Sequence, residues 1–228
     1  MQKVTTSGNS IEVSKENIIK SSILTAGEQA KLTPAVVLDM LKSGNQKFLE
    51  AKLTIRNNSQ RVRNAVFGQY PKAAIVSCSD SRIPIEDVFH QGIGDLFVVR
   101  IAGNFVNSDI LGSLEYACKV SGIKLVVILG HEHCGAVISA IDDVKLGNIT
   151  TMLENIKPAI TNASKNFAGE KTSKNHEFVK SVSSYNVQHA IEEARSKSLI
   201  LKEMENNDEI KIVGGMYHMK TGKVDFIL

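Results

Sequence analysis

The sequence predicts an α/β fold in which helices flank a mainly parallel central β-sheet, with an antiparallel edge strand and an N-terminal helical arm. Short, nearly continuous apolar runs alternate with longer helical stretches, as in a parallel sheet covered on both faces. The 228 residues, 43% of them hydrophobic, are enough for one domain with a substantial core. Chemically active side chains directly follow two of the apolar runs, where parallel sheets carry their functional groups.

The N-terminal arm is assigned to residues 1–32 and the main domain to residues 33–228. The arm is polar and shows one expected short helix, near Ala26 to Lys31. Because it has no other strong periodicity, the arm is expected either to be flexible or to wrap a neighbouring subunit.

The main domain is predicted to open with two helices. Thr33 is a favoured N-cap and Pro34 suits the first helical position. One apolar stripe at helical spacing follows, made of Val37, Met40, Leu41 and Phe48. A second, basic helix is expected from Gln60 to Phe67. The basic residues around it are predicted to form a solvated helix face, and they are Arg56, Arg61 and Arg63.

Three buried parallel strands are predicted next, at Ala73 to Ser77, Leu96 to Ile101 and Leu125 to Leu129. The clearest helix between them runs from Asp109 to Val120, with Ser108 or Asp109 as its cap.

The C-terminal third is predicted to complete the sheet. A long amphipathic helix from His176 to Lys197 precedes a fourth strand, Ile210 to Gly214. Val224 to Leu228 reads as an edge strand after a turn. The polar region from Asn148 to Asn175 receives no assignment.

Composition limits the partners and the compartment. The formal net charge of +3 indicates no nucleic-acid partner, and no apolar run reaches the ~20 residues that span a bilayer, so no membrane partner is expected. The polar start of the chain lacks the centre of a secretory signal, which predicts a cytoplasmic location, or a periplasmic one if a leader was removed. Three cysteines fit a reducing compartment with two metal thiolates and one buried thiol, Cys118.

Two separate segments offer a metal-ligand set. Cys78 follows one predicted strand and His131 another, while Cys134 begins a helical stretch just after His131. A thiolate is favoured at a helix N-terminus. Two sulfurs and one nitrogen form a three-ligand zinc set that leaves the fourth position for water, as in catalytic zinc sites. The sequence therefore predicts zinc-dependent hydration or hydrolysis chemistry.

A carboxylate and a guanidinium accompany the first cysteine. Asp80 and Arg82 are two residues apart, so a turning backbone can pair them. The carboxylate can then accept a hydrogen bond from metal-bound water, or move onto the metal as a fourth ligand in a closed state. Glu132 and His133 are interpreted as non-ligands.

Five motifs resemble those of the β-class carbonic anhydrases from about Leu32 onward. They are Cys-Ser-Asp-Ser-Arg at 78–82, Gly-Asp-Leu-Phe-Val-Val-Arg at 94–100, Ala-Gly-Asn at 102–104, Gly-Ser-Leu-Glu-Tyr-Ala at 112–117 and Gly-His-x-x-Cys-Gly at 130–135. The resemblance implies a zinc lyase that hydrates carbon dioxide reversibly to bicarbonate and a proton by attack of zinc-bound hydroxide, in homodimers or homotetramers. It also implies Zn²⁺ ligands at Cys78, His131 and Cys134, and a catalytic dyad of Asp80 and Arg82.

The resemblance is greatest to the family's plant-like branch. Matching positions imply a carbon dioxide pocket lined by Gln69, Phe97 and Tyr116. Another branch has a bicarbonate inhibitory site that requires a tryptophan where this chain has Ile75, and the chain contains no tryptophan. The departure implies an open zinc position.

Two alternatives share the ligand set. One is a related zinc hydrolase acting on carbon disulfide or carbonyl sulfide, and the other is a non-catalytic zinc-binding module in which Asp80 closes the site. A cysteine-dependent phosphatase does not fit, because three residues separate Cys78 from Arg82 where that loop needs five.

Overall fold

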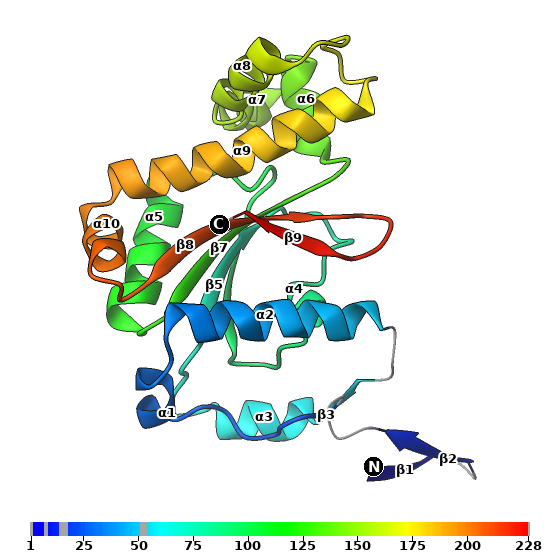
Figure 1. Cartoon of the computed structure of the whole chain (residues 1–228), viewed down its shortest axis with the longest axis vertical. Coiled ribbons are helices and arrows are strands. Elements are labelled where there is room, and N and C mark those ends of the chain that lie inside the picture. The colour runs from blue at the N-terminus through cyan, green and yellow to red at the C-terminus, as the bar shows by residue number, and fades with distance from the viewer. Residues whose placement is uncertain (1, 7–8, 14–17, 51–53, 228) are drawn as a thin grey trace.

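The computed structural model describes residues 2–6, 9–13, 18–50 and 54–227. Its centre is a five-stranded sheet of order β6-β5-β7-β8-β9, in which the first four strands are parallel and β9 is antiparallel (Figure 1). The strands are β5 Ala73–Ser77, β6 Leu96–Arg100, β7 Leu125–His131, β8 Lys211–Tyr217 and β9 Val224–Ile227. The predicted parallel sheet with an antiparallel edge is confirmed; Leu228 lies outside the described residues.

Helices cover both faces of the sheet (Figure 1). Ala73 and Ile75 of β5 share a core with α2 and α4, whereas Ala74 and Val76 pack with α5, η2, α9 and α10. This alternation follows from the two-residue period of a strand. The helices are α2 Pro34–Leu49, α4 Ile85–Val88, α5 Ser108–Glu115, the π-helix η2 Tyr116–Val120, α9 His176–Lys197 and α10 Leu199–Asn206.

A third cluster of buried residues lies beyond the carboxyl ends of the strands, between α9 and the helices that follow β7. These helices are α6 Gly135–Ile141, α7 Gly147–Glu154 and α8 Lys157–Asn166. The last two occupy the region that received no assignment from the sequence. Their core includes Cys78 and Cys134, so the metal-type residues sit at the junction of sheet and helical layer.

Several predicted boundaries differ from the structure. The side chain that caps α5 is Asn107, which accepts from the Ile110 N–H; Ser108 and Asp109 lie inside the helix. Strand β7 continues two residues beyond the predicted Leu129, because β8 pairs with it as far as His131 opposite Tyr217.

The N-terminal region contains short strands that the sequence did not predict. Its described residues contain one short helix, α1 Ala26–Ala30, near the predicted position. Before it, β1 Gln2–Thr6 and β2 Asn9–Val13 form an antiparallel pair, and β3 Ile18–Ile19 pairs in parallel with β4 Ile55–Arg56. The division into an arm and a main domain stays a prediction. None of the described helices combines the length and the apolarity needed to cross a membrane.

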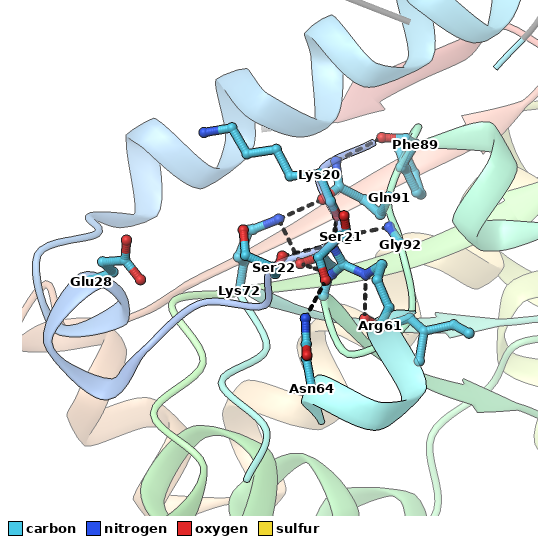
Figure 2. Close-up of polar contacts among 12 residues, drawn as sticks. Lys20, Ser21, Ser22, Glu28, Arg61, Asn64, Lys72, Phe89, Gln91 and Gly92 are labelled. Atoms are coloured by element: carbon cyan, nitrogen blue, oxygen red, sulfur yellow. Dashed lines mark hydrogen bonds and ion pairs between the residues drawn. The ribbon is translucent and has the colours of Figure 1, made fainter. Parts of the chain in front are cut away.

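Arg61 is the clearest departure from the sequence prediction. It lies on α3 Asn58–Asn64, and only 2% of it is exposed. The prediction of a solvated face was therefore wrong for this residue. Its guanidinium lies 3.0 Å from the Asp95 carboxylate and donates to three backbone carbonyls, and Figure 2 labels two of the residues that carry them, Lys20 and Ser22. These carbonyls belong to Lys20, Ser22 and Ile93.

Replacing Arg61 by alanine is expected to lower the free energy of unfolding by roughly 3–5 kcal/mol, because it leaves the buried Asp95 carboxylate with Lys72 as its sole ion-pair partner among the described residues. Urea denaturation followed by circular dichroism measures this loss. Arg63→Ala is the matched control, since Arg63 is exposed on the same helix and should change stability by less than about 0.5 kcal/mol. Equal losses of unfolding free energy in the two variants would contradict the role of Arg61 as a buried ion-pair partner.

Candidate metal centre

The register of the sheet brings the two metal-type segments together. Strands β5 and β7 are parallel neighbours, with Ser77 opposite Leu129, so Cys78 and His131 both lie at the carboxyl ends of the strands. Cys134 is the N-cap residue of α6. The ligand atoms of these three residues all lie within 4.8 Å of one another, and all three residues are buried. The structure thus places the three predicted ligands in one cluster.

The imidazole is oriented for ligation. His131 Nδ1 lies 2.8 Å from the Glu132 carbonyl oxygen, which can only accept, so the proton belongs on Nδ1. Nε2 then carries a free lone pair. It is fully buried and has no hydrogen-bond partner within the described residues. A buried acceptor without a partner is unfavourable unless a ligand completes it, so the side chain fits a metal ion.

The two thiols also fit a metal. Their sulfurs are 3.9 Å apart. The pKa of Cys78 is lowered to about 4 because the Cys134 thiol donates a hydrogen bond to its sulfur, and the same contact raises the pKa of Cys134. The Gly103 N–H also donates to Cys78 Sγ, at 3.4 Å. Two sulfurs and one imidazole nitrogen are the donor set that zinc prefers.

Asp80 and Arg82 form the expected pair beside this cluster. The Arg82 side chain donates to both carboxylate oxygens at 2.9 and 2.6 Å, and the Arg82 backbone N–H adds a third bond of 2.9 Å. These contacts lower the pKa of Asp80 to about 2. The carboxylate is not part of the cluster of ligand atoms. In this structure it is held by Arg82.

Arg100 supports the same turn and was not singled out from the sequence. It ends β6, opposite Ser77 in the neighbouring strand. Its Nε donates to the Cys78 carbonyl at 3.0 Å, and its Nη2 donates to the Asp80 carbonyl. The signal that could have found it is its position at a strand end beside the first cysteine.

The predicted substrate-pocket residues do not reach the cluster of their own chain. Phe97 pairs with Ala74 in the sheet. Ala74 precedes Cys78 by four residues, a separation of about 13 Å along the strand. Tyr116 is 54% exposed and contacts the Phe97 ring edge-on, with centroids 6.4 Å apart. Gln69 is exposed in the loop before β5. The structure brings Phe97 and Tyr116 together, but away from the thiols.

The remaining candidates lie outside the cluster. His133 is exposed and its ring packs against that of His176. The Glu132 carboxylate accepts from His218 and from the Met219 N–H, which directly follow the neighbouring strand β8. Cys118 is buried in the core, and burial raises its pKa to about 12, so it is an inert packing residue.

Comparisons with known proteins agree with this arrangement. A family model described as carbonic anhydrase matches residues 73–224. The chain is 40% identical over 133 residues to carbonic anhydrase 2 of Mycobacterium tuberculosis, covering 56% of this chain and 64% of that relative. It is 33% identical over 198 residues to a carbonic anhydrase of Mycolicibacterium smegmatis, covering 84% and 92% of the two chains.

A solved structure has a similar fold. It is one of two β-carbonic anhydrases from the ascomycete Sordaria macrospora that are described as tetrameric. The TM-score is 0.65 at 25% sequence identity, and the match covers 74% of this chain and 86% of the other.

Proposed function

The chain belongs to the β-class carbonic anhydrase family, and on that premise we propose that it hydrates carbon dioxide reversibly to bicarbonate and a proton, with zinc held by Cys78, His131 and Cys134. The observation that carries this proposal is the buried Nε2 of His131, which has no hydrogen-bond partner among the described residues and lies with the two sulfurs in one cluster. A completed core would not leave that atom without a partner.

The residues around the cluster suit this reaction. When bound, zinc acts as a Lewis acid that makes water a nucleophile near neutral pH. Asp80 offers an ionised carboxylate that accepts a hydrogen bond from the attacking water and orients it. Arg82 keeps that carboxylate charged and fixed by its two parallel bonds. Arg100 holds the backbone of the turn that carries both groups.

Metal analysis combined with stopped-flow carbon dioxide hydration tests the proposal. We expect about one zinc per chain and turnover that is lost when the metal is removed by a chelator. Zinc without turnover at any pH would favour a non-catalytic zinc module. Turnover restricted to carbon disulfide or carbonyl sulfide would favour the related hydrolase.

We further propose that the active form is a homodimer or homotetramer in which a second copy covers the β6 edge. Strand β6 ends the sheet, and no described strand pairs with its outer side. Phe97 is half-buried there and Tyr116 is exposed. Gln69, Phe97 and Tyr116 lie away from the metal cluster of their own chain. We therefore propose that they line a substrate pocket beside the metal cluster of the second copy. A cytoplasmic location stays a prediction.

Val120→Glu is expected to weaken this assembly. Val120 is 67% exposed and lies one turn beyond Tyr116 in η2. A charge there should raise the dissociation constant of the oligomer by on the order of tenfold or more, and lower the turnover without loss of zinc. Light scattering with size-exclusion chromatography measures the assembly. Val36→Glu, on the opposite face of the sheet, is the control, and an unchanged oligomer in both variants would contradict the proposed interface.

A further inference from the structure

Gly103 lies against the metal cluster, at a position where other residue types do not fit. Its N–H donates to Cys78 Sγ at 3.4 Å. Its φ is +91°, and a Cβ at this position would lie 2.7 Å from Ile156 Cδ1 and 3.2 Å from Ala136 Cβ. Glycine is thus required, but glycine is also the residue with the greatest backbone freedom. A contact that fixes its backbone therefore helps to keep its N–H on the sulfur.

Asn186 supplies that group from the long helix α9. Its side chain is 1% exposed, and its Nδ2 donates to the Gly103 carbonyl at 2.7 Å. Gly103 is therefore held on both sides, by Cys78 through its N–H and by Asn186 through its carbonyl.

The bond to Gly103 is the one side-chain hydrogen bond that the Asn186 amide makes among the described residues. Its Oδ1 is buried and has no hydrogen-bond partner among the described residues, and the same holds for Asn104 Nδ2 in the adjacent turn. An unsatisfied buried acceptor costs stability. An apolar side chain of similar size would avoid that cost but would leave the buried Gly103 carbonyl without this donor, so the contribution of the amide is its bond to Gly103.

We propose that Asn186 is a positioning residue for the metal site: it anchors Gly103 so that the Gly103 N–H stays on Cys78 Sγ and moderates the donor strength of that sulfur. A hydrogen bond to a thiolate withdraws electron density from it, so the sulfur donates less to the metal and the metal remains a stronger Lewis acid. The inference rests on the proposed function, because it requires a metal at the cluster.

The test uses the full chain loaded with Co²⁺ as a spectroscopic probe, and separately with Zn²⁺. In Asn186→Leu, the sulfur-to-cobalt charge-transfer band should move to longer wavelength, since an unmoderated thiolate gives up an electron more easily. Because the sulfur then donates more strongly to the metal, zinc release to a chelator should slow and the rate of carbon dioxide hydration should fall, each by about 10–100-fold. Ser183→Ala is the matched control. Ser183 is equally buried on the same helix face, and its hydroxyl donates within the helix to Val179.

The outcomes separate this inference from the proposed function. A folded Asn186→Leu with the parent's charge-transfer band and zinc release overturns the inference, whatever its activity, and Asn186→Ala decides the matter if the leucine variant does not fold. Loss of the fold in both variants marks Asn186 as a structural residue and overturns it too. If the parent chain binds metal but does not hydrate carbon dioxide, the proposed function fails while the spectroscopic result stands.

Discussion

Replacing His131 by alanine is expected to abolish both zinc binding and carbon dioxide hydration. Among the described residues the His131 imidazole supplies the one nitrogen of the cluster, and without it two thiols 3.9 Å apart remain. Hydration should fall by at least about a thousandfold, to the assay limit, because the site loses its Lewis acid. Cys78→Ser should give the same result. Atomic absorption of the purified variants and stopped-flow hydration measure the two losses.

His133→Asn is the control for that experiment, because asparagine tolerates the positive φ of 53° at this position. His133 lies two residues from His131, is exposed, and contacts His176 and not the thiols. Zinc content and rate should stay within about twofold of the parent, because the substitution keeps the backbone conformation and removes only an exposed ring. Retention of zinc and full turnover in His131→Ala would refute the ligand assignment.

Replacing Asp80 by asparagine is expected to separate metal binding from catalysis. Asp80 lies outside the cluster of ligand atoms, so the variant should keep its zinc. It should lose roughly 10²- to 10⁴-fold in turnover, since the amide lacks the charge that receives and orients the attacking water. Asp143→Asn is the control, because Asp143 is an exposed carboxylate that is also paired with a cation, Lys145.

The pH dependence of the Asp80→Asn defect follows from the low pKa of Asp80. That pKa is about 2, so the carboxylate is fully ionised throughout the neutral range. A depressed pKa means that charge is lost only as the pH falls toward 2. The ratio of variant to parent rates should therefore stay constant between about pH 6 and pH 9. A ratio that rises to one at either end of this range would contradict the assigned role.

The strands and long helices could be predicted because their signals are local. Continuous apolar runs located β5 at its observed bounds, and helical periodicity located α9. The cap of α5 could not be predicted, since Asn107, Ser108 and Asp109 are consecutive and all favour an N-cap. Only the Asn107 contact with the backbone decides among them.

The site residues could be predicted where they lie at the carboxyl ends of parallel strands. Cys78 and His131 each follow or end a parallel strand, so their meeting follows from sheet geometry. Arg100 and Asn186 act on backbone carbonyls, and such contacts leave no motif in the sequence. The burial of Arg61 was missed for a related reason, because its partner Asp95 is distant in the chain and its charge alone suggests solvent.

The anchor at Arg61 has a consequence for how the chain tolerates change. Arg61 holds the N-terminal segment by the carbonyl oxygens of Lys20 and Ser22, and every amino acid carries such an oxygen. The identities of the gripped residues are thus interchangeable as far as this attachment is concerned. Asn64 adds a bond of the same kind, to the Ser21 carbonyl oxygen. Substitutions of Arg61 or Asn64 should therefore disturb this attachment more than substitutions of Lys20, Ser21 or Ser22.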